Sequence, residues 1–373
     1  MNRKASATAF TCFCRCSIRQ GRTDHETLCK KVCSSFFVVF PLNKQELFII
    51  MLHTLLFGFS TASMPVNVAL LVLGIYIVLK GADWLTDGAV GLASRFGISQ
   101  FVIGITIVAM GTSMPEFCVS MVSALKGTPD LAVGNVVGSN IFNTLLIVGC
   151  SALVAPITVK VTTVKRDMIF AILASVLMLV FCLDGSISRL DAVAFLVLFA
   201  IFIRAMLRQA KPSEGEDEPS ADSKPLWRQV IFVVLGLSAL IAGSNVFVDN
   251  ASFIASSLGV SDAVIGLTIV AGGTSLPELA TSVVSARKGN SDIAIGNVMG
   301  SNVFNILMII GVTGLVQPMH IAGITFTDLL VLVGSALIMW FFCRTKYRVD
   351  RWEGTVLVVC FLCYLGYLLV QVA

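Results

Sequence analysis

The chain has 373 residues, of which 56% are hydrophobic and only 13% charged, and its mean hydropathy is +0.90. A soluble domain carries about 25% charged residues, so this composition excludes a soluble protein and indicates one with many membrane spans. The net charge of +4 does not indicate a nucleic-acid partner, because the basic residues fall in separate loops rather than in one patch. Of the eleven cysteines, those in apolar segments are expected to act as small packing residues.

Residues 1–63 differ from the rest of the chain. They carry eight basic residues and a cluster of five cysteines that lacks the paired CxxC spacing of a zinc site. Their basic start and the apolar run Leu47 to Phe59 faintly resemble a signal sequence. We interpret them as an N-terminal extension, with translation beginning downstream at Met51 or Met64, and we expect transport without them.

Ten apolar runs of membrane-spanning length follow, five in each half of the chain. In chain order they are 65–93, 99–125, 131–154, 167–183, 189–207, 227–257, 261–287, 292–315, 323–343 and 354–371. Because five is odd, the second set must enter the membrane from the opposite side to the first. The sequence therefore predicts an all-α polytopic membrane protein, with ten transmembrane helices arranged as two inverted five-helix repeats.

Lysine and arginine residues in the loops predict the orientation of the helices. With residue 64 outside, the cytoplasmic loops of the core hold fifteen basic residues, and the outer loops hold only Lys126 and Arg189. The stretch Gln209 to Leu226 is rich in Pro, Ser, Glu and Asp, which predicts a solvated cytoplasmic linker without the spacing of an EF-hand. The predicted domains are the extension 1–63, the first repeat 64–208, the linker 209–226 and the second repeat 227–373.

One segment of the sequence occurs twice. At a constant offset of 162 and without a gap, Gly97 to Asn143 and Gly259 to Asn305 are identical at 30 of 47 positions. The shared residues are mostly Gly, Ser, Thr and Asn, with one Glu, embedded in apolar sequence. Such residues suit a cation site inside a membrane better than simple packing in lipid, so the duplication indicates a transporter with internal symmetry.

The first shared block reads GTSMPE and GTSLPE, and it ends at Glu116 and Glu278 in the middle of the second and seventh predicted helices. Proline lacks an N–H and clashes with the carbonyl four residues back, so Pro115 and Pro277 predict helix breaks whose free carbonyls line a cavity. A simple kink would explain the prolines but not an intramembrane glutamate beside each of them. Neighbouring helices offer no Lys or Arg at that depth, so a bound cation is the expected partner of both glutamates.

The second shared block, GNVVGSNIFN and GNVMGSNVFN, opens the third and eighth predicted helices. Its polar residues recur about once per turn, which puts much of the set on one helix face. They are Asn135, Ser139, Asn140 and Asn143, with the equivalents Asn297, Ser301, Asn302 and Asn305. Hydroxyl, amide, carbonyl and carboxylate oxygens are ligands of hard cations such as Ca2+ and Na+. Taken singly, the Gly and Ser positions are equally well explained as helix-packing surfaces, and Asn140 and Asn302 as hydrogen-bond partners of the broken helices.

Both blocks together, present twice and inverted, resemble the α-repeats of the cation/Ca2+ exchanger superfamily. Within it they are similar to the bacterial calcium/sodium antiporters of the potassium-dependent sodium/calcium exchanger type, and the resemblance covers residues 64–371. It implies exchange of Ca2+ for Na+ across the inner (plasma) membrane, with both ions as transported substrates and with no cofactor, enzyme activity or obligatory protein partner. The metal site that it implies comprises Glu116, Glu278, Thr112, Ser113, Thr274, Ser275, Ser139, Ser301, Asn143 and Asn305, with the carbonyls of Ala109 and Ala271.

Asn305 departs from the pattern of many exchangers of this family, which have Asp there, and its mate Asn143 is also Asn. Two carboxylates then balance one Ca2+ or two Na+, which leaves the stoichiometry open and does not favour a potassium requirement. The alternative function is a Ca2+/H+ antiporter, in which both glutamates take up protons instead of binding Na+. A passive channel would need no counter-ion, and an intramembrane enzyme is disfavoured because the three histidines lie outside the duplicated segments Gly97 to Asn143 and Gly259 to Asn305.

The long first and sixth predicted helices carry glycines in the same register. These are Gly74, Gly81, Gly236 and Gly243. Small residues let helices lie close together, and we interpret these as a surface on which helices 65–93 and 227–257 slide over a core that holds the two glutamates. Asp87 and Asp249, near the ends of these helices, are expected at the membrane interface rather than in the site.

Overall fold

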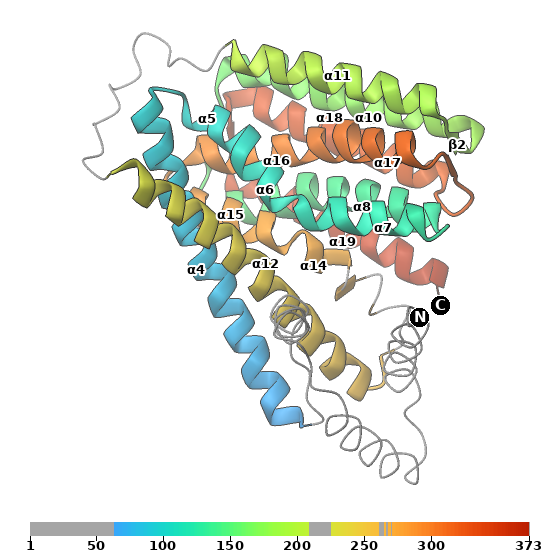
Figure 1. Ribbon diagram of the computed structural model, residues 1–373, viewed down its shortest axis with the longest axis horizontal. Coiled ribbons are helices and arrows are strands. Elements are labelled where there is room, and N and C mark those ends of the chain that lie inside the picture. Colours follow the sequence, from blue (N-terminus) through green and yellow to red (C-terminus); the bar gives the residue numbers. More distant parts are fainter. Residues whose placement is uncertain (1–62, 209–224, 261–264, 266–267, 270, 373) are drawn as a thin grey trace, which may run out of the picture. The chain divides into compact units, whose positions relative to one another are not determined.

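The structure is a computed structural model that describes residues 63–208, 225–260, 265, 268–269 and 271–372 (Figure 1). These residues all belong to one compact unit, Leu55–Ala373. The predicted N-terminal extension and almost all of the predicted linker lie outside the described residues, as does most of the first part of the predicted helix 261–287.

Most of the predicted membrane spans are present as long apolar helices. Eight spans among the described residues are long and apolar enough to cross a bilayer. They are α4 (Met64–Phe96), Pro129–Val154, Thr163–Asp184, α11 (Arg189–Leu207), α12 (Leu226–Ser257), Ser291–Val316, α18 (Phe326–Lys346) and α19 (Arg351–Val372). A ninth crossing is a bent pair, Gln100–Thr112 with Met114–Leu125. Of the seventh predicted span, 261–287, the structure describes α14 (Ala271–Thr274) and α15 (Leu276–Arg287).

Several spans are not uniform α-helices. The composite spans contain α5 (Gln100–Ile103), η1 (Gly104–Val108), α6 (Ala109–Thr112), α7 (Met114–Leu125), α8 (Pro129–Ile141), η2 (Phe142–Ile147), α9 (Val148–Val154), η3 (Thr163–Asp167), α10 (Met168–Phe181), η4 (Cys182–Asp184), α16 (Ser291–Val303), η6 (Phe304–Ile310) and α17 (Gly311–Val316). Of these, η1, η2, η3 and η6 are π-helical, and η4 is a short 3-10 turn. Single π-helical turns inside α-helices are frequent at functional sites, and Asn143 and Asn305 lie in two of them.

The two halves are connected by reciprocal strand pairs. Strand β1 (Ile157–Thr158) pairs antiparallel with β4 (Arg348–Val349), and β2 (Ser186–Ile187) pairs antiparallel with β3 (Met319–His320). At the offset of 162, β1 is equivalent to β3 and β2 to β4, so each pair joins one half of the chain to the other. A contact repeated in this reciprocal way is what an approximate two-fold axis between two similar units produces.

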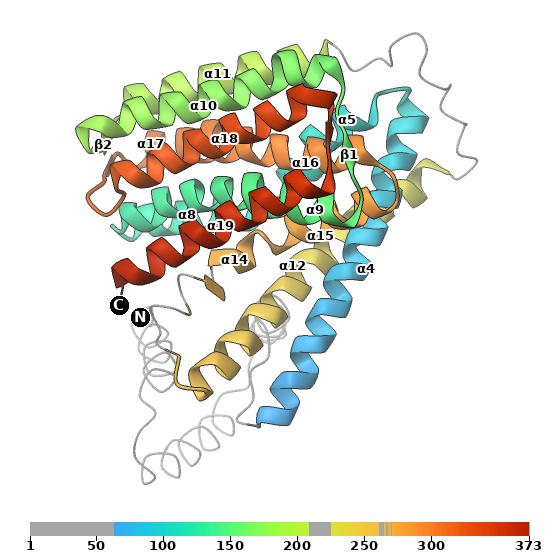
Figure 2. The ribbon, with the colours of Figure 1, turned by 180° about the vertical axis from the view of Figure 1, so that it is seen from behind.

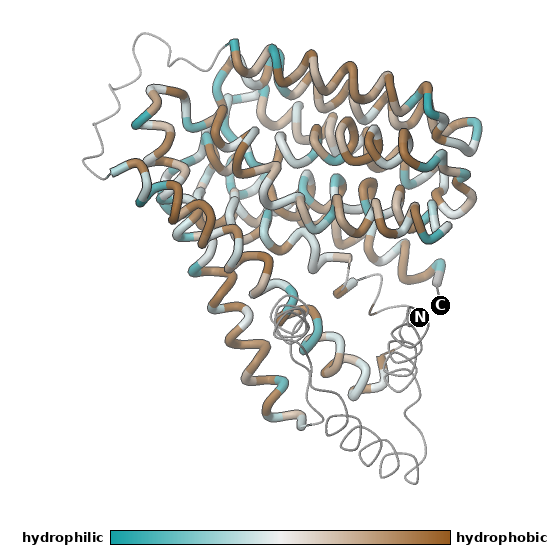
Figure 3. Tube along the Cα trace, in the orientation of Figure 1, coloured by the Kyte–Doolittle hydropathy of each residue, from teal (hydrophilic) through white to brown (hydrophobic). Residues whose placement is uncertain are grey.

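Burial separates the spans into a centre and a periphery. Most residues of Ser291–Val316 and Pro129–Val154 are buried, whereas only a minority are buried in α4, α11, α12 and α19. Figure 3 shows hydrophobic residues along most of α11, with hydrophilic ones at its ends. The outer helices therefore present apolar side chains to lipid, and the central spans carry the repeated polar block.

The long helices α4 and α12 form a pair whose buried residues belong to a second apolar cluster, which they share with residues of neighbouring spans. They lie side by side over much of their length (Figures 1 and 2). Their buried residues, among them Leu85 and Leu240, join a cluster separate from the main core, which contains no residue of α4 or α12. We call these two helices the α4–α12 pair and the remaining spans the scaffold.

The four glycines in register pack within the pair, so their interpretation as a sliding surface was wrong. A Cβ on Gly81 would lie 2.9 Å from the carbonyl oxygen of Gly236, and a Cβ on Gly236 would lie 2.6 Å from the backbone nitrogen of Leu85. Gly74 and Gly243 likewise meet the opposite helix of the pair. The glycines let the two backbones touch, which locks α4 to α12 rather than loosening the pair from the scaffold.

Candidate cation-binding site

The helix breaks predicted from the sequence are present, and each is centred on a serine. Ser113 separates α6 from α7 with φ −82° and ψ 8°, and the two helical segments of this span are bent by 45°. Ser275 separates α14 from α15 with φ −89° and ψ 7°. Pro115 and Pro277 lie in the first turn after each break, where a missing N–H costs no hydrogen bond.

Each glutamate is held by a serine from the other repeat. The hydroxyl of Ser113 donates to Oε1 of Glu278 at 2.8 Å, and the hydroxyl of Ser275 donates to Oε1 of Glu116 at 3.0 Å. Both carboxylates are fully buried, and each lies in the first turn of a helix, where the helix dipole favours negative charge. The four side chains therefore form one reciprocal cluster in which the two breaks meet.

The second oxygen of each carboxylate has no protein partner. Buried polar atoms are nearly always hydrogen-bonded, but several around the two breaks are not. The unpartnered buried atoms of the two shared blocks are Glu116 Oε2, Glu278 Oε2, Ser301 Oγ, Asn140 Oδ1, Asn302 Oδ1, and both side-chain polar atoms of Asn143 and of Asn305. In the described part of the chain no group of three His, Cys, Asp or Glu side chains could hold a metal ion. The donor set here is therefore two carboxylates with neutral oxygens, which suits a hard cation.

Some of the remaining predicted ligands already form hydrogen bonds within the protein. The hydroxyl of Thr112 donates to Oδ1 of Asn297 at 3.2 Å and to the carbonyl of Ala109 at 3.3 Å. The same carbonyl accepts the N–H of Ser113 at 3.0 Å. Ser139 and Ser301 are buried on α8 and α16. The structure thus brings the predicted residues into one region, with the first-repeat Thr and Ala engaged in protein hydrogen bonds.

The two halves of the site are not equally accessible. Ala109 and Thr112 are fully buried. Their equivalents in the second repeat are more accessible, because Ala271 is exposed and Thr274 is half-buried. Thr274 donates to the carbonyl of Ala271 at 3.2 Å. In the orientation predicted from the basic loops, α14 is on the outer side of its break, so the more accessible half of the site is the predicted outer one.

Two asparagines that were not included among the predicted ligands position the glutamates. Nδ2 of Asn135 donates to the carbonyl of Glu116 at 3.1 Å and to Oγ of Ser120 at 2.9 Å. Nδ2 of Asn297 makes the equivalent bonds to the carbonyl of Glu278 at 3.3 Å and to Oγ of Ser282 at 2.9 Å. Each amide therefore fixes the backbone of one glutamate to the neighbouring polar helix. Both repeats have Asn at this position, which indicated a role in the site, but the sequence does not show which helix these asparagines contact.

We expect Asn297→Ala to weaken the apparent Ca2+ affinity of transport by roughly tenfold, because it removes one hydrogen bond to the carbonyl of Glu278 and one to Oγ of Ser282, each worth about 1 kcal/mol. Asn135→Ala should have a smaller effect, since Asn135 is only partly buried and accepts no bond from the other repeat. The measurement is the Ca2+ dependence of flux in proteoliposomes, with Asn290→Ala outside the two shared blocks as control. An unchanged Ca2+ dependence in Asn297→Ala would mean that this amide does not position the carboxylate.

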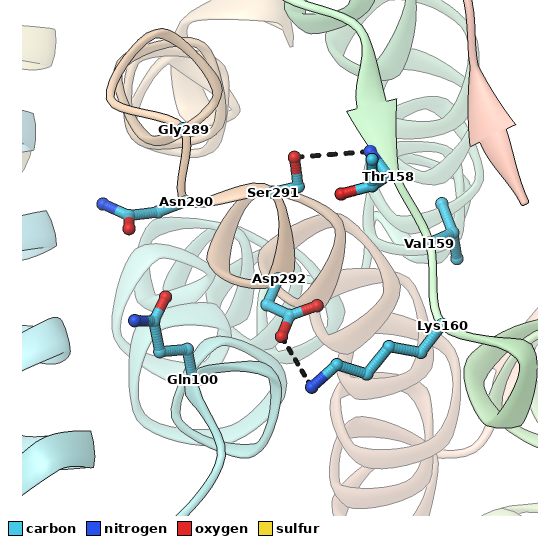
Figure 4. Close-up of a pocket in the computed structure, with 8 residues that line it drawn as sticks. All are labelled: Gln100, Thr158, Val159, Lys160, Gly289, Asn290, Ser291 and Asp292. Carbon is cyan, nitrogen blue, oxygen red and sulfur yellow. Dashed lines mark hydrogen bonds and ion pairs between the residues drawn. The ribbon is translucent and has the colours of Figure 1, made fainter. Parts of the chain in front are cut away.

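A separate polar pocket lies at the start of α16, away from the glutamates. Figure 4 shows Lys160 and Asp292 facing each other in it, with Nζ and Oδ2 2.9 Å apart. The backbone N–H of Thr158 donates to Oγ of Ser291 at 3.3 Å. Its lining residues are Gln100, Thr158, Val159, Lys160, Gly289, Asn290, Ser291 and Asp292. Its one carboxylate is already neutralised by Lys160, so it does not compete with the Glu116 and Glu278 cluster as a cation site.

The sodium/calcium exchanger protein family matches the chain twice, over residues 66–208 and 228–370. The chain belongs to this family. It is 39% identical over 312 residues to the putative antiporter CaxA of Alkalimonas amylolytica, covering 81% of this chain and 98% of that protein. It is 36% identical over 314 residues to the inner membrane protein YrbG of Escherichia coli strain K12, covering 80% of this chain and 96% of that protein.

A solved structure is also similar to this exchanger. The sodium-calcium exchanger NCX_Mj, soaked with 10 mM Na+ and zero Ca2+, superposes with a TM-score of 0.73 at 31% sequence identity. The match covers 82% of this chain and 99% of NCX_Mj. The resemblance noted from the repeated blocks is therefore confirmed, and the chain is a multi-pass membrane protein of the cation/Ca2+ exchanger type.

Proposed function

We propose that this exchanger is a secondary antiporter that moves Ca2+ against Na+ at one site built around Glu116 and Glu278. The observation that carries the proposal is the reciprocal pairing of Ser113 with Glu278 and of Ser275 with Glu116, which leaves one buried oxygen of each carboxylate unpartnered. Two unpartnered carboxylate oxygens with no basic residue bonded to them need a cation to offset the cost of burial.

The charge of the site fits exchange of these two ions. Two carboxylates are neutralised by one Ca2+ or by two Na+, and Asn143 and Asn305 add neutral oxygens rather than further charge. Hydroxyls of Ser139 and Ser301 and the carbonyls of Ala109 and Ala271 complete the proposed donor set. The ions are transported substrates, and no cofactor, chemical step or protein partner enters the proposal.

The proposed alternating access is a movement of the α4–α12 pair relative to the scaffold. Glycines that bring the two backbones of the α4–α12 pair into contact support movement of the pair as one unit against the scaffold. The two glutamates belong to the scaffold spans, so moving the pair would expose them first to one side of the membrane and then to the other.

The proposed architecture is ten transmembrane helices in two inverted repeats, 64–208 and 227–373, joined by the cytoplasmic linker 209–226. The equivalence of elements at the offset of 162 and the reciprocal strand pairs support it. The proposed location is the inner (plasma) membrane, as the name of YrbG states for that relative.

The counter-ion is tested by Ca2+ uptake into proteoliposomes under one imposed gradient at a time. We expect an outward Na+ gradient to drive uptake and a pH gradient of equal size not to drive it. Uptake driven by the pH gradient alone would instead establish a Ca2+/H+ antiporter. Ca2+ flux that needs no counter-ion would indicate a passive channel.

A further inference from the structure

An ionic contact joins the α4–α12 pair to the scaffold at the end of α15. Nζ of Lys288 lies 3.0 Å from Oδ1 of Asp83 and 2.8 Å from Oδ1 of Asp87, and it also donates to the carbonyl of Asp83 at 3.3 Å. Nearby, the buried hydroxyls of Thr86 and Ser285 lie 3.0 Å apart and join the same two helices. Lys288 therefore fastens α4 to α15 on the face of the molecule that is rich in basic loop residues.

Charged residues also occupy the equivalent positions of the other repeat. At the offset of 162, Lys126 is equivalent to Lys288 and Asp249 to Asp87. Within the residues that the structure describes, neither the side chain of Lys126 nor that of Asp249 has an ion-pair or hydrogen-bond partner. The end of α7, which carries Lys126, does not pack along α12 in the way that α15 packs along α4.

This asymmetry agrees with the accessibility of the site. The contact is formed on the cytoplasmic side, where Ala109 and Thr112 are buried, and it is absent on the outer side, where Ala271 is exposed and Thr274 half-buried. If two similar repeats exchange their conformations, every contact of one state has an equivalent in the other. Applied to Lys288, this rule gives a contact between Lys126 and Asp249 that the present conformation does not contain.

We propose that the two lysines are alternating latches. Lys288 with Asp83 and Asp87 holds the cytoplasmic side closed, and Lys126 with Asp249 holds the outer side closed after the α4–α12 pair has moved. This inference rests on the proposed alternating access, and it assigns a role to two charged positions outside the ion site.

The latches are weak enough to open in every cycle. The side chains of Lys288 and Asp83 are about a quarter exposed, at 26% and 28%, and that of Asp87 is 52% exposed. Such partly exposed ion pairs shift an equilibrium by a factor of about two to five. Asn245 replaces the second aspartate in the outer latch, so the outer latch has one carboxylate where the inner one has two.

Cross-linking of cysteine pairs tests the inference in the full-length protein, with its native cysteines replaced by serine or alanine. The two latch pairs are Asp87→Cys with Lys288→Cys, and Asp249→Cys with Lys126→Cys. We expect a bifunctional methanethiosulfonate of lysine length, which joins each thiol through a disulfide and releases sulfinate, to link both pairs in proteoliposomes and to stop exchange in each; a thiol reductant, which cleaves these disulfides, should restore exchange. The crossed pair, Asp87→Cys with Lys126→Cys, is the matched control and should not be linked.

Charge exchange provides a second, independent measurement. We expect Lys126→Asp to slow exchange about two- to fivefold, and Asp249→Lys in the same chain to restore the rate. Failure of the Asp249 and Lys126 cysteines to cross-link, in a protein that exchanges ions normally before treatment, would overturn the latch and leave the antiport standing. If neither the wild-type protein nor the untreated cysteine-free protein exchanges Ca2+ for Na+, the proposed function itself is overturned.

Discussion

Glu116→Gln and Glu278→Gln should each abolish Ca2+ transport while leaving the protein folded in the membrane. Glutamine keeps the acceptor for the serine of the other repeat but removes the charge that a cation needs. Losing one partner of a buried charged contact costs about 3–5 kcal/mol, which corresponds to a loss of Ca2+ affinity of about a hundredfold or more. The measurement is uptake of radiolabelled Ca2+ into proteoliposomes under an outward Na+ gradient, with size-exclusion profiles as the test of folding.

The two variants should fail alike, because the cluster is reciprocal and each carboxylate accepts a hydrogen bond from the serine of the other repeat. Asp184→Asn is the matched control, since it removes one carboxylate from a loop at the end of a span, outside the two shared blocks. Uptake near the wild-type rate in either glutamate variant would remove that residue from the ion site.

Gly236→Leu should unfold or inactivate the exchanger, because it forces apart the two helices of the α4–α12 pair. Even a Cβ at this position would lie 2.6 Å from backbone nitrogen and 2.9 Å from the Gly81 carbonyl oxygen, and neither atom can move without displacing α4. Over-packing by a few atoms typically costs about 1–3 kcal/mol, so Gly236→Ala should lower the melting temperature and leucine should do so more strongly.

Gly366→Leu is the control for this series. Gly366 lies on an exposed face of α19, and no described atom lies within 4 Å of a Cβ built there. Leucine also has a higher helix propensity than glycine, so this variant should melt at or above the wild-type temperature. If Gly236→Leu and Gly366→Leu melt at the same temperature, α4 and α12 are not packed through their glycines.

The positions of the spans and of the helix breaks could be predicted because each has a strong local cause. The predicted span 189–207 has the bounds of α11, and the prediction 227–257 differs from α12 by one residue. The breaks at Ser113 and Ser275 follow from a proline two residues later, whose ring excludes a regular helix. The glutamates were identified because a buried carboxylate without a basic neighbour is rare in a membrane.

The contacts between helices could not be predicted, because they depend on which helix surfaces pack against each other. The glycines at 81 and 236 were recognised as close-contact positions, but the sequence does not say that each faces the other long helix rather than the scaffold. The donations by Asn135 and Asn297 likewise depend on how α8 and α16 lie against the broken helices. The two strand pairs are only two residues long, which is too short for an alternating pattern to be read.

These strand pairs also bear on how the protein is made. Each pair needs one strand from each half of the chain, and β3 and β4 emerge from the ribosome long after β1 and β2. The first half must therefore wait in the bilayer with Glu116 still without the hydroxyl of Ser275. Insertion of the early helices and assembly of the polar centre are thus separate events in biogenesis, and the β1–β4 pair forms only after Arg348–Val349 has been synthesised.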